Sequence, residues 1–94
     1  MRVEVDVLRR ALQRLLDHVE EVNGAVVEVP EDLYWFVQAD CLNDPTKDPT
    51  NLTLGSLDDD WAEVSAIGRG TKEPVGRSLV WASSILRAVG ERTI

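Results

Sequence analysis

Aspartates are the residues of this sequence whose type and spacing come closest to a chemical site. Asp40, Asp44 and Asp48 recur at intervals of four, and a run from Asp58 to Asp60 follows. Carboxylate oxygens are the ligands that Ca²⁺ and Mg²⁺ prefer, so these acids could hold a divalent ion if the fold brought them together. The spacing differs from that of an EF-hand loop, and two of the acids precede prolines, as turn formers do. Turns and helix starts are the favoured explanation, and a metal site stays an open alternative.

The one cysteine and the one histidine do not complete a recognisable catalytic set. Cys41 is flanked by acids, which oppose the thiolate that a nucleophile needs. His18 falls on the charged side of a predicted helix, and zinc sites need three or four such ligands. We therefore expect no catalytic residue and assign no cofactor.

A glycine-rich segment, 68–72, precedes a predicted helix and could present backbone N–H groups to an anion. It lacks the full phosphate-loop spacing and does not follow a convincing strand, and Glu73 would oppose an anion. A turn between two helices is the better interpretation.

The aromatic residues allow two interpretations. If Tyr34 or Trp35 pointed outward beside the acidic loop, the pair would make an anchor for a protein partner, because aromatic side chains dominate interface hot spots. Large aromatic side chains are mostly buried, so we expect them to fill the core instead. The full set comprises Tyr34, Trp35, Phe36, Trp61 and Trp81.

The charge balance favours some partners over others. Seventeen acidic residues face ten basic ones, which gives a formal net charge of −7. Such a field repels nucleic acid and anionic membranes and speeds encounter with a basic protein surface. The excess of acidic residues can also be explained by solubility alone, without any role in binding.

The compartment can be inferred from three features. The single Cys41 cannot form an internal disulfide, the start of the chain lacks the apolar stretch of a signal peptide, and no apolar run is long enough to span a bilayer. These features predict a cytoplasmic protein without a membrane segment.

The strongest secondary-structure signal predicts a helix through Arg9 to Glu21. Apolar residues recur there at steps of three and four, and Asn23-Gly24 should end the helix. This stripe could also pair with its symmetry mate in a homodimer. Its six positions are Val5, Leu8, Leu12, Leu15, Val19 and Val22.

The middle of the chain is typical of strands and a loop. β-Branched residues at 25–29 and the aromatic run at 33–37 predict two short strands, with a helical turn from Asp32 as the second choice. Residues 38–51 show no period and predict a loop, and 52–54 could add a third strand.

Two further helices are expected in the second half. Ser56 with Asp59 resembles a capping box, so a helix should start there, bury Trp61, and end at Gly68-Arg69-Gly70. The next should begin at Pro74 and end at Gly90 with its polar residues, Ser84 among them, on a narrow wet side.

Together these elements predict a mainly helical α+β fold: residues 1–94 form one compact domain of three amphipathic helices packed with a small hairpin or short sheet near 25–37. The first and third helices should supply most of the core.

Several short motifs follow one another along the chain in a fixed order: Leu33-Tyr34-Trp35, Asp44-Pro45, Leu52-Thr53-Leu54-Gly55, Asp59-Asp60-Trp61, Pro74-Val75, Leu79-Val80-Trp81 and Leu86-Arg87-Ala88. This order resembles that of a family of short uncharacterised bacterial proteins. The resemblance implies a bacterial cytosolic origin and no activity.

A non-catalytic protein-binding module is the function that the sequence favours, in the manner of an antitoxin or immunity protein that neutralises a basic effector. A small enzyme or ligand-binding domain with an acidic metal site, and a structural homo-oligomer, are the alternatives. The expected partner-binding residues are Tyr34, Trp35, Asp40, Asp44, Asp48, Asp58 and Asp59.

Overall fold

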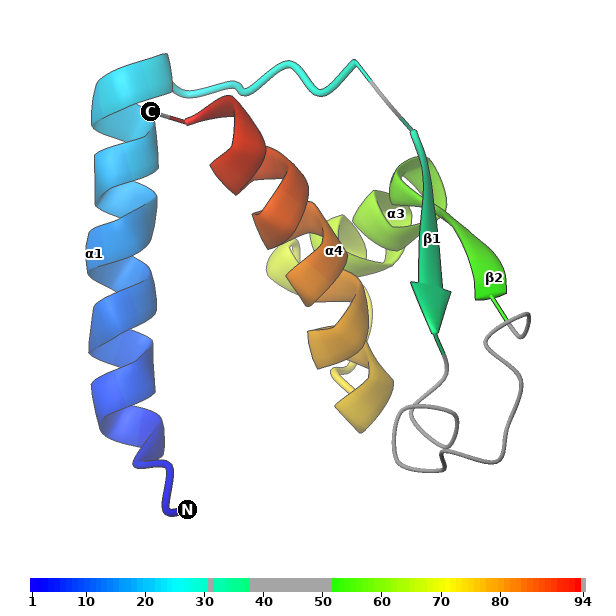
Figure 1. The fold of residues 1–94 in the computed structure, drawn as a ribbon. Helices are drawn as coiled ribbons and strands as arrows, with labels where there is room; N and C mark the ends of the chain where they lie inside the picture. The colour runs from blue at the N-terminus through cyan, green and yellow to red at the C-terminus, as the bar shows by residue number, and fades with distance from the viewer. Residues whose placement is uncertain (31, 38–51, 94) are drawn as a thin grey trace. The chain divides into compact units, whose positions relative to one another are not determined.

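The computed structural model describes residues 1–30, 32–37 and 52–93. The elements in chain order are α1 (Val5–Asn23), β1 (Leu33–Val37), β2 (Leu52–Ser56), α3 (Leu57–Gly68) and α4 (Gly76–Arg92) (Figure 1). Helices dominate, and the two strands form one antiparallel sheet. The predicted mainly helical α+β class is confirmed.

The chain divides into two compact units. The first comprises Met1–Val29 and the chain from Leu86 onward, and the second runs from Pro30 to Ile85. Helix α4 therefore contributes its beginning to the second unit and its end to the first. The expectation of one cooperative domain stays a prediction.

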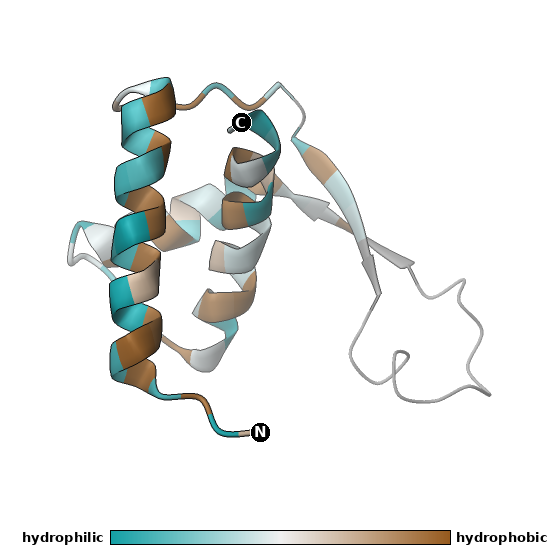
Figure 2. Ribbon diagram, turned by 60° about the vertical axis from the view of Figure 1, so that its left-hand side comes forward, coloured by the Kyte–Doolittle hydropathy of each residue, from teal (hydrophilic) through white to brown (hydrophobic). Residues whose placement is uncertain are grey.

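Helix α1 confirms the predicted first helix and extends it at both ends. It stops where expected, because Gly24 adopts φ of +85° and its N–H donates to the Glu20 carbonyl at 2.8 Å. Figure 2 shows alternating hydrophobic and hydrophilic bands along the helix.

The expected core is not observed. Among the residues whose side-chain burial is described, which leave out 36–37 and 52–53 of the hairpin, no hydrophobic residue is buried, and the two buried residues are polar, Asp60 and Ser78. The prediction that the first and third helices supply a core is therefore wrong for these residues. Trp61, expected inside, is 51% exposed.

The hairpin joins β1 to β2. Trp35 lies opposite Leu54, and Tyr34 lies opposite Gly55. The strand expected at 25–29 is absent, because no other described segment pairs with that stretch and Pro30 cannot donate to a ladder. The strand considered at 52–54 is confirmed and takes its place beside β1.

The start of α3 is held by two side chains. As predicted, the Ser56 hydroxyl caps the helix by accepting from the Asp59 N–H at 3.3 Å. Asp32, at the foot of β1, adds a second cap, because its carboxylate accepts from the Asp58 N–H at 2.6 Å and from the Ser56 hydroxyl at 3.1 Å. These hydrogen bonds of Asp32 therefore connect the start of β1 to the start of α3.

Helix α4 is displaced from its expected bounds. It begins at Gly76 instead of Pro74, because the Val75 N–H donates to the Ser78 hydroxyl at 3.0 Å and Val75 takes the capping place. It also continues past Gly90. Thr93 closes the end by donating its hydroxyl to the Val89 carbonyl at 2.8 Å.

Among the helices of the described residues, none is both long and apolar enough to cross a membrane.

The capping arrangement predicts a measurable loss of stability for Ser56→Ala. Removing an N-cap hydroxyl costs about 1 kcal/mol, which should lower Tm by roughly 4–8 °C in a domain of this size. Ser83→Ala is the matched control, because the Ser83 hydroxyl is exposed and only bonds the Val80 carbonyl within its own helix. Thermal unfolding followed by circular dichroism measures both, and equal Tm values would contradict the role of the cap.

Candidate functional site

A buried carboxylate joins three elements of the second unit. Asp60, on α3, is 7% exposed, and its Oδ2 accepts hydrogen bonds from the Tyr34 hydroxyl of β1 and from the Ser84 hydroxyl of α4 at 2.6 Å. Buried charges are stable only when such donors satisfy them. The bonds therefore fix the hairpin, α3 and α4 with respect to one another.

Gly55 allows Tyr34 to reach Asp60. Tyr34 is half-buried, and its ring lies over Gly55 on the opposite strand. A Cβ at position 55 would fall 2.7 Å from Tyr34 Cε1, closer than side-chain carbons approach. Glycine at this position leaves room for the ring that carries the hydroxyl to the carboxylate.

The surroundings of Tyr34 raise its pKa above the ordinary value of 10.0. Desolvation is the largest cause, and the hydrogen bond to Asp60 adds to it because an anionic neighbour disfavours a tyrosinate. Ser84 and Arg77 act in the opposite direction. Tyr34 therefore stays neutral and keeps its proton in the bond to Asp60.

The arrangement around Asp60 fits a structural role better than catalysis. Activation of a serine ordinarily needs a base that is itself held by a third group, as histidine is in hydrolases. Here the Ser84 hydroxyl lies between the Asp60 carboxylate and the Trp81 carbonyl, at 2.7 Å from the latter, and the carboxylate is closed to solvent. The network holds elements in place.

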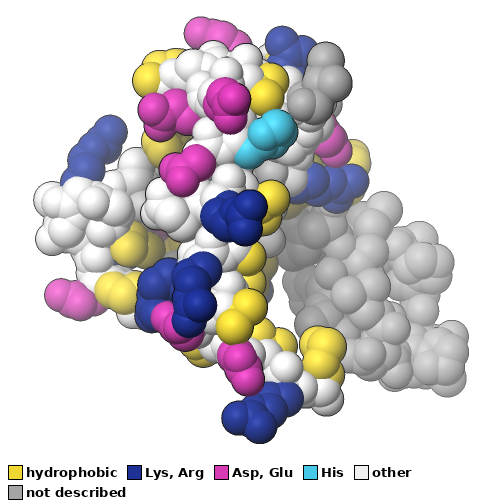
Figure 3. Space-filling model, turned by 90° about the vertical axis from the view of Figure 1, so that its left-hand side faces the viewer, with side chains coloured by type: hydrophobic (Ala, Val, Ile, Leu, Met, Phe, Trp, Pro, Cys, Tyr) yellow, Lys and Arg dark blue, Asp and Glu magenta, His cyan; other side chains and the backbone are white. Residues whose placement is uncertain are grey.

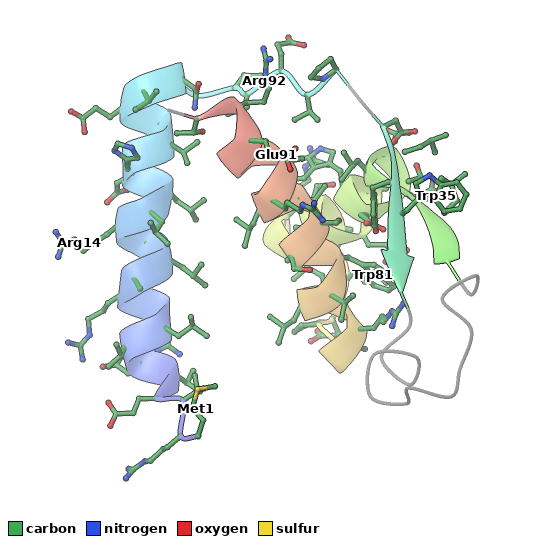
Figure 4. All side chains as sticks on the ribbon, in the orientation of Figure 1. Met1, Arg14, Trp35, Trp81, Glu91 and Arg92 are labelled. Carbon is green, nitrogen blue, oxygen red and sulfur yellow. The ribbon has the colours of Figure 1, made fainter. Side chains whose placement is uncertain are left out.

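The opposite side of the hairpin presents apolar side chains. Because Tyr34 faces the helices, its neighbours Leu33 and Trp35 point the other way, and Leu54 lies across from Trp35 on the same side. Trp35 is 63% exposed, and the two leucines are exposed as well. In Figure 4 the Trp35 side chain projects from the hairpin on the side away from α4. We call Leu33, Trp35 and Leu54 the Trp35 face.

Three exposed acids lie at the end of the hairpin where Leu33 pairs with Ser56. Leu33 lies opposite Ser56, and Asp58 and Asp59 follow in the first turn of α3. The Asp32 carboxylate, which bonds the Asp58 N–H, lies beside them. We call Asp32, Asp58 and Asp59 the acidic rim. An apolar aromatic centre with a charged rim is the usual composition of a protein-binding surface.

A second apolar surface lies between α3 and α4. Val64 and Ile67 of α3 and Leu79 and Ala82 of α4 line an open groove of about 400 Å³. The hydroxyl of Ser78, which also lines the groove, is already bonded to the Val75 N–H. The groove therefore suits an apolar side chain better than a polar ligand.

The predicted site residues fall into three groups. Asp58 and Asp59 lie at the start of α3, next to the end of the hairpin where Leu33 pairs with Ser56, whereas Tyr34 lies on the other side of the hairpin from Trp35. Asp40, Asp44 and Asp48, like Cys41, lie outside the described residues, so their part in binding stays a prediction. Within the described residues, no three His, Cys, Asp or Glu side chains lie close enough to hold a metal ion.

The glycine-rich segment is a turn between α3 and α4, as predicted. The Arg69 and Thr71 N–H groups donate to carbonyls of α3, at 2.9 Å in both cases. Lys72 pairs with Glu63, and its Nζ lies 6.0 Å from the centroid of the Trp81 ring. These two backbone N–H groups and the Lys72 ammonium group thus already have partners within the protein, which disfavours the anion site considered above. His18 is exposed on α1, also as predicted.

Sequence reasoning missed Asp60 and Ser84. Asp60 was counted with the charges at a helix start, and Ser84 was placed on the wet side of α4. The partners of Asp60 lie 26 and 24 residues away, so no local pattern marks them. The sequence offered one indication of this network, which is that Tyr34, a hydrogen-bond donor, lies in a predicted strand that precedes the acidic run from Asp58 to Asp60.

Comparison with known proteins gave no match to any family model, curated protein or solved structure. The resemblance to short bacterial proteins therefore stays a prediction, and the function must be argued from the geometry.

The environment of Tyr34 predicts a high titration midpoint. The chain has one tyrosine, so tyrosinate absorbance reports this side chain alone. The midpoint should lie above 10.0 in the native protein and fall in Asp60→Asn, which removes the negative neighbour. Since the folded state holds this proton more tightly than the unfolded state, stability is constant below pH 10 on this account and decreases as pH rises further. A native midpoint at or below 10.0 would contradict this assignment.

Proposed function

We propose that the protein is a non-catalytic protein-binding module that recognises a basic partner through the Trp35 face and the acidic rim. The observation that carries this proposal is the exposure of Trp35 beside two exposed leucines on the outer side of a hairpin. Large apolar side chains grouped on a surface mark interaction sites more often than they mark plain surface.

The Trp35 face has the features of an interface centre. Trp35 offers a large apolar area and an indole N–H at a low cost in rotamer freedom, which is why tryptophan is enriched in hot spots. Leu33 and Leu54 flank it and would exclude water from its edges. The hairpin backbone and the Asp60 hydrogen bonds hold the Trp35 face in place, so binding should cost little conformational entropy.

The acidic rim favours a basic partner. Asp58 and Asp59 are exposed and lie next to Asp32, in a chain whose net charge is −7. Opposite charges around an apolar centre accelerate association and select against acidic partners, nucleic acid and anionic membranes. The predicted loop acids Asp40, Asp44 and Asp48 would extend the same charge.

One concrete form of this function is the neutralisation of a basic effector by an antitoxin or immunity protein in the bacterial cytoplasm. Such proteins act by covering a surface and need no catalytic group. The proposal rests on the Trp35 face and the acidic rim, and it holds for any basic protein partner of that geometry.

Trp35→Ser should abolish partner capture. The tagged chain would be incubated with lysate of the source organism, and proteins that are retained would be identified by mass spectrometry. Loss of a hot-spot tryptophan costs at least about 2 kcal/mol, or roughly thirtyfold in affinity. Trp61→Ser is the matched control, because Trp61 is also exposed but lies on α3 outside the Trp35 face.

Salt separates the charged part of the interaction from the apolar part. The captured partner should be a basic protein, and its affinity should decrease as the salt concentration is raised. The affinity of the double variant Asp58→Asn/Asp59→Asn should depend less on salt, because the variant lacks two of the charges. Equal capture by Trp35→Ser and the native chain would contradict the proposal, as would an acidic partner held equally at all salt concentrations.

A further inference from the structure

Helix α1 carries an apolar seam of six positions, of which four are exposed and two, Leu12 and Val19, are half-buried. The helix is described in full and none of its residues is buried, and Val5, Leu8, Leu15 and Val22 are all classed as exposed. Leu15 is 60% exposed, although it lies at the middle of the stripe. An amphipathic helix is stabilised mainly by the face that it buries, so this seam calls for a partner.

The spacing of the seam fits a second copy of α1. The six positions are separated by three, four, three, four and three residues. This is the spacing of the a and d positions in three successive heptads. The series reads the same in both directions. In an antiparallel pair, Val5 meets Val22 of the other copy, Leu8 meets Val19, and Leu12 meets Leu15, so every position finds an apolar counterpart.

Charge distinguishes the two possible orientations. From Val5 to Arg14 the helix carries three arginines against Asp6, a net charge of +2. From Leu15 to Asn23 it carries three acids and no lysine or arginine, a net charge of −3 with His18 neutral. Figure 3, which faces α1, shows the basic side chains mainly along its N-terminal half and acidic side chains along its C-terminal half.

A parallel pair would place like charges side by side, whereas an antiparallel pair places the basic half of each copy along the acidic half of the other. The helix dipoles also oppose each other favourably in the second arrangement. We infer that two copies of this chain associate through an antiparallel pairing of their α1 helices. This inference is independent of the Trp35 face, which lies in the other unit of the chain.

The expected dimer is weak. A helix of 19 residues is about 28 Å long, and a two-helix seam of that length lies at the low end of specific interfaces. We expect a dissociation constant in the micromolar range that rises with salt, because the flanking charges are exposed. Sedimentation velocity over a range of protein concentrations would measure it.

Leu12→Asp tests the seam. It places a charge in the central layer against Leu15 of the other copy, so association should weaken at least thirtyfold. Gln13→Asp is the matched control, because the same charge then lies on the polar side of the same helix, where Gln13 is exposed and bonds Asp17. Circular dichroism of both variants shows whether α1 stays helical.

Cross-linking tests the orientation without disturbing the fold. In a Cys41→Ser background, the Val5→Cys chain and the Val22→Cys chain should each form little disulfide dimer alone and should form it readily when mixed. Cross-linking of the Val5→Cys chain with itself would show a parallel pair and overturn the orientation. A chain that stays monomeric at all concentrations up to about 1 mM would overturn the dimer altogether.

A charge-reversed helix gives a second route if Leu12→Asp unfolds. The triple variant Asp17→Lys/Glu20→Lys/Glu21→Lys leaves the seam intact and makes the helix basic at both ends, so it should lose self-association at low salt. The complementary variant Arg9→Glu/Arg10→Glu/Arg14→Glu should lose it as well, and the two variants mixed should recover a dimer. Failure of the mixture to recover it would contradict pairing by charge.

Discussion

The Asp60 carboxylate accepts two hydroxyl hydrogen bonds in a place that water hardly reaches, and the second unit is organised around it. Removing a carboxylate from water is costly, and the Tyr34 and Ser84 donors offset that cost. Because the donors come from β1 and α4 while the acceptor is on α3, the carboxylate sets the position of all three elements. Gly55 is part of this constraint, since any side chain there would push the Tyr34 ring away.

This constraint turns the hairpin so that Trp35 faces outward. Neighbouring residues of a strand point to opposite sides, so the bond that draws Tyr34 toward the helices directs Leu33 and Trp35 to the other side. The polar network and the apolar side chains of the Trp35 face therefore come from opposite sides of the hairpin. Among the residues whose side-chain burial is described, no hydrophobic residue is buried, and partners that cover the Trp35 face or the α1 seam would add apolar burial to these residues.

The sequence predicted the elements that depend on neighbours and missed those that depend on distant contacts. The first helix, its end at Gly24 and the Ser56 cap are local features, and all three were predicted correctly. The strand expected at 25–29 failed because a strand needs a partner, and the β-branched pattern carries no information about pairing. Asp32 was missed as a cap for the same reason, since it reaches α3 from 26 residues away.

The candidate site was predicted in part. Trp35 and Asp58 were named from residue type alone; both belong to the second unit, and their part in binding stays a prediction. Which aromatic residue faces outward could not be read from the sequence, because Tyr34 and Trp35 are neighbours and only the Asp60 bond distinguishes their directions. The outcome reversed the favoured interpretation for Trp35, which was expected inside.

Amide hydrogen exchange in Tyr34→Phe tests most directly whether the Asp60 bonds hold the hairpin in place. The variant keeps the aromatic ring and removes one hydrogen bond to a charged group, which is worth about 1.5 kcal/mol or more. The account predicts that amides of β1 and β2 exchange at least about tenfold faster than in the native chain, while amides in the middle of α1 keep their rates. Unchanged protection of the hairpin in a folded variant would show that Asp60 does not position it, and would contradict the account.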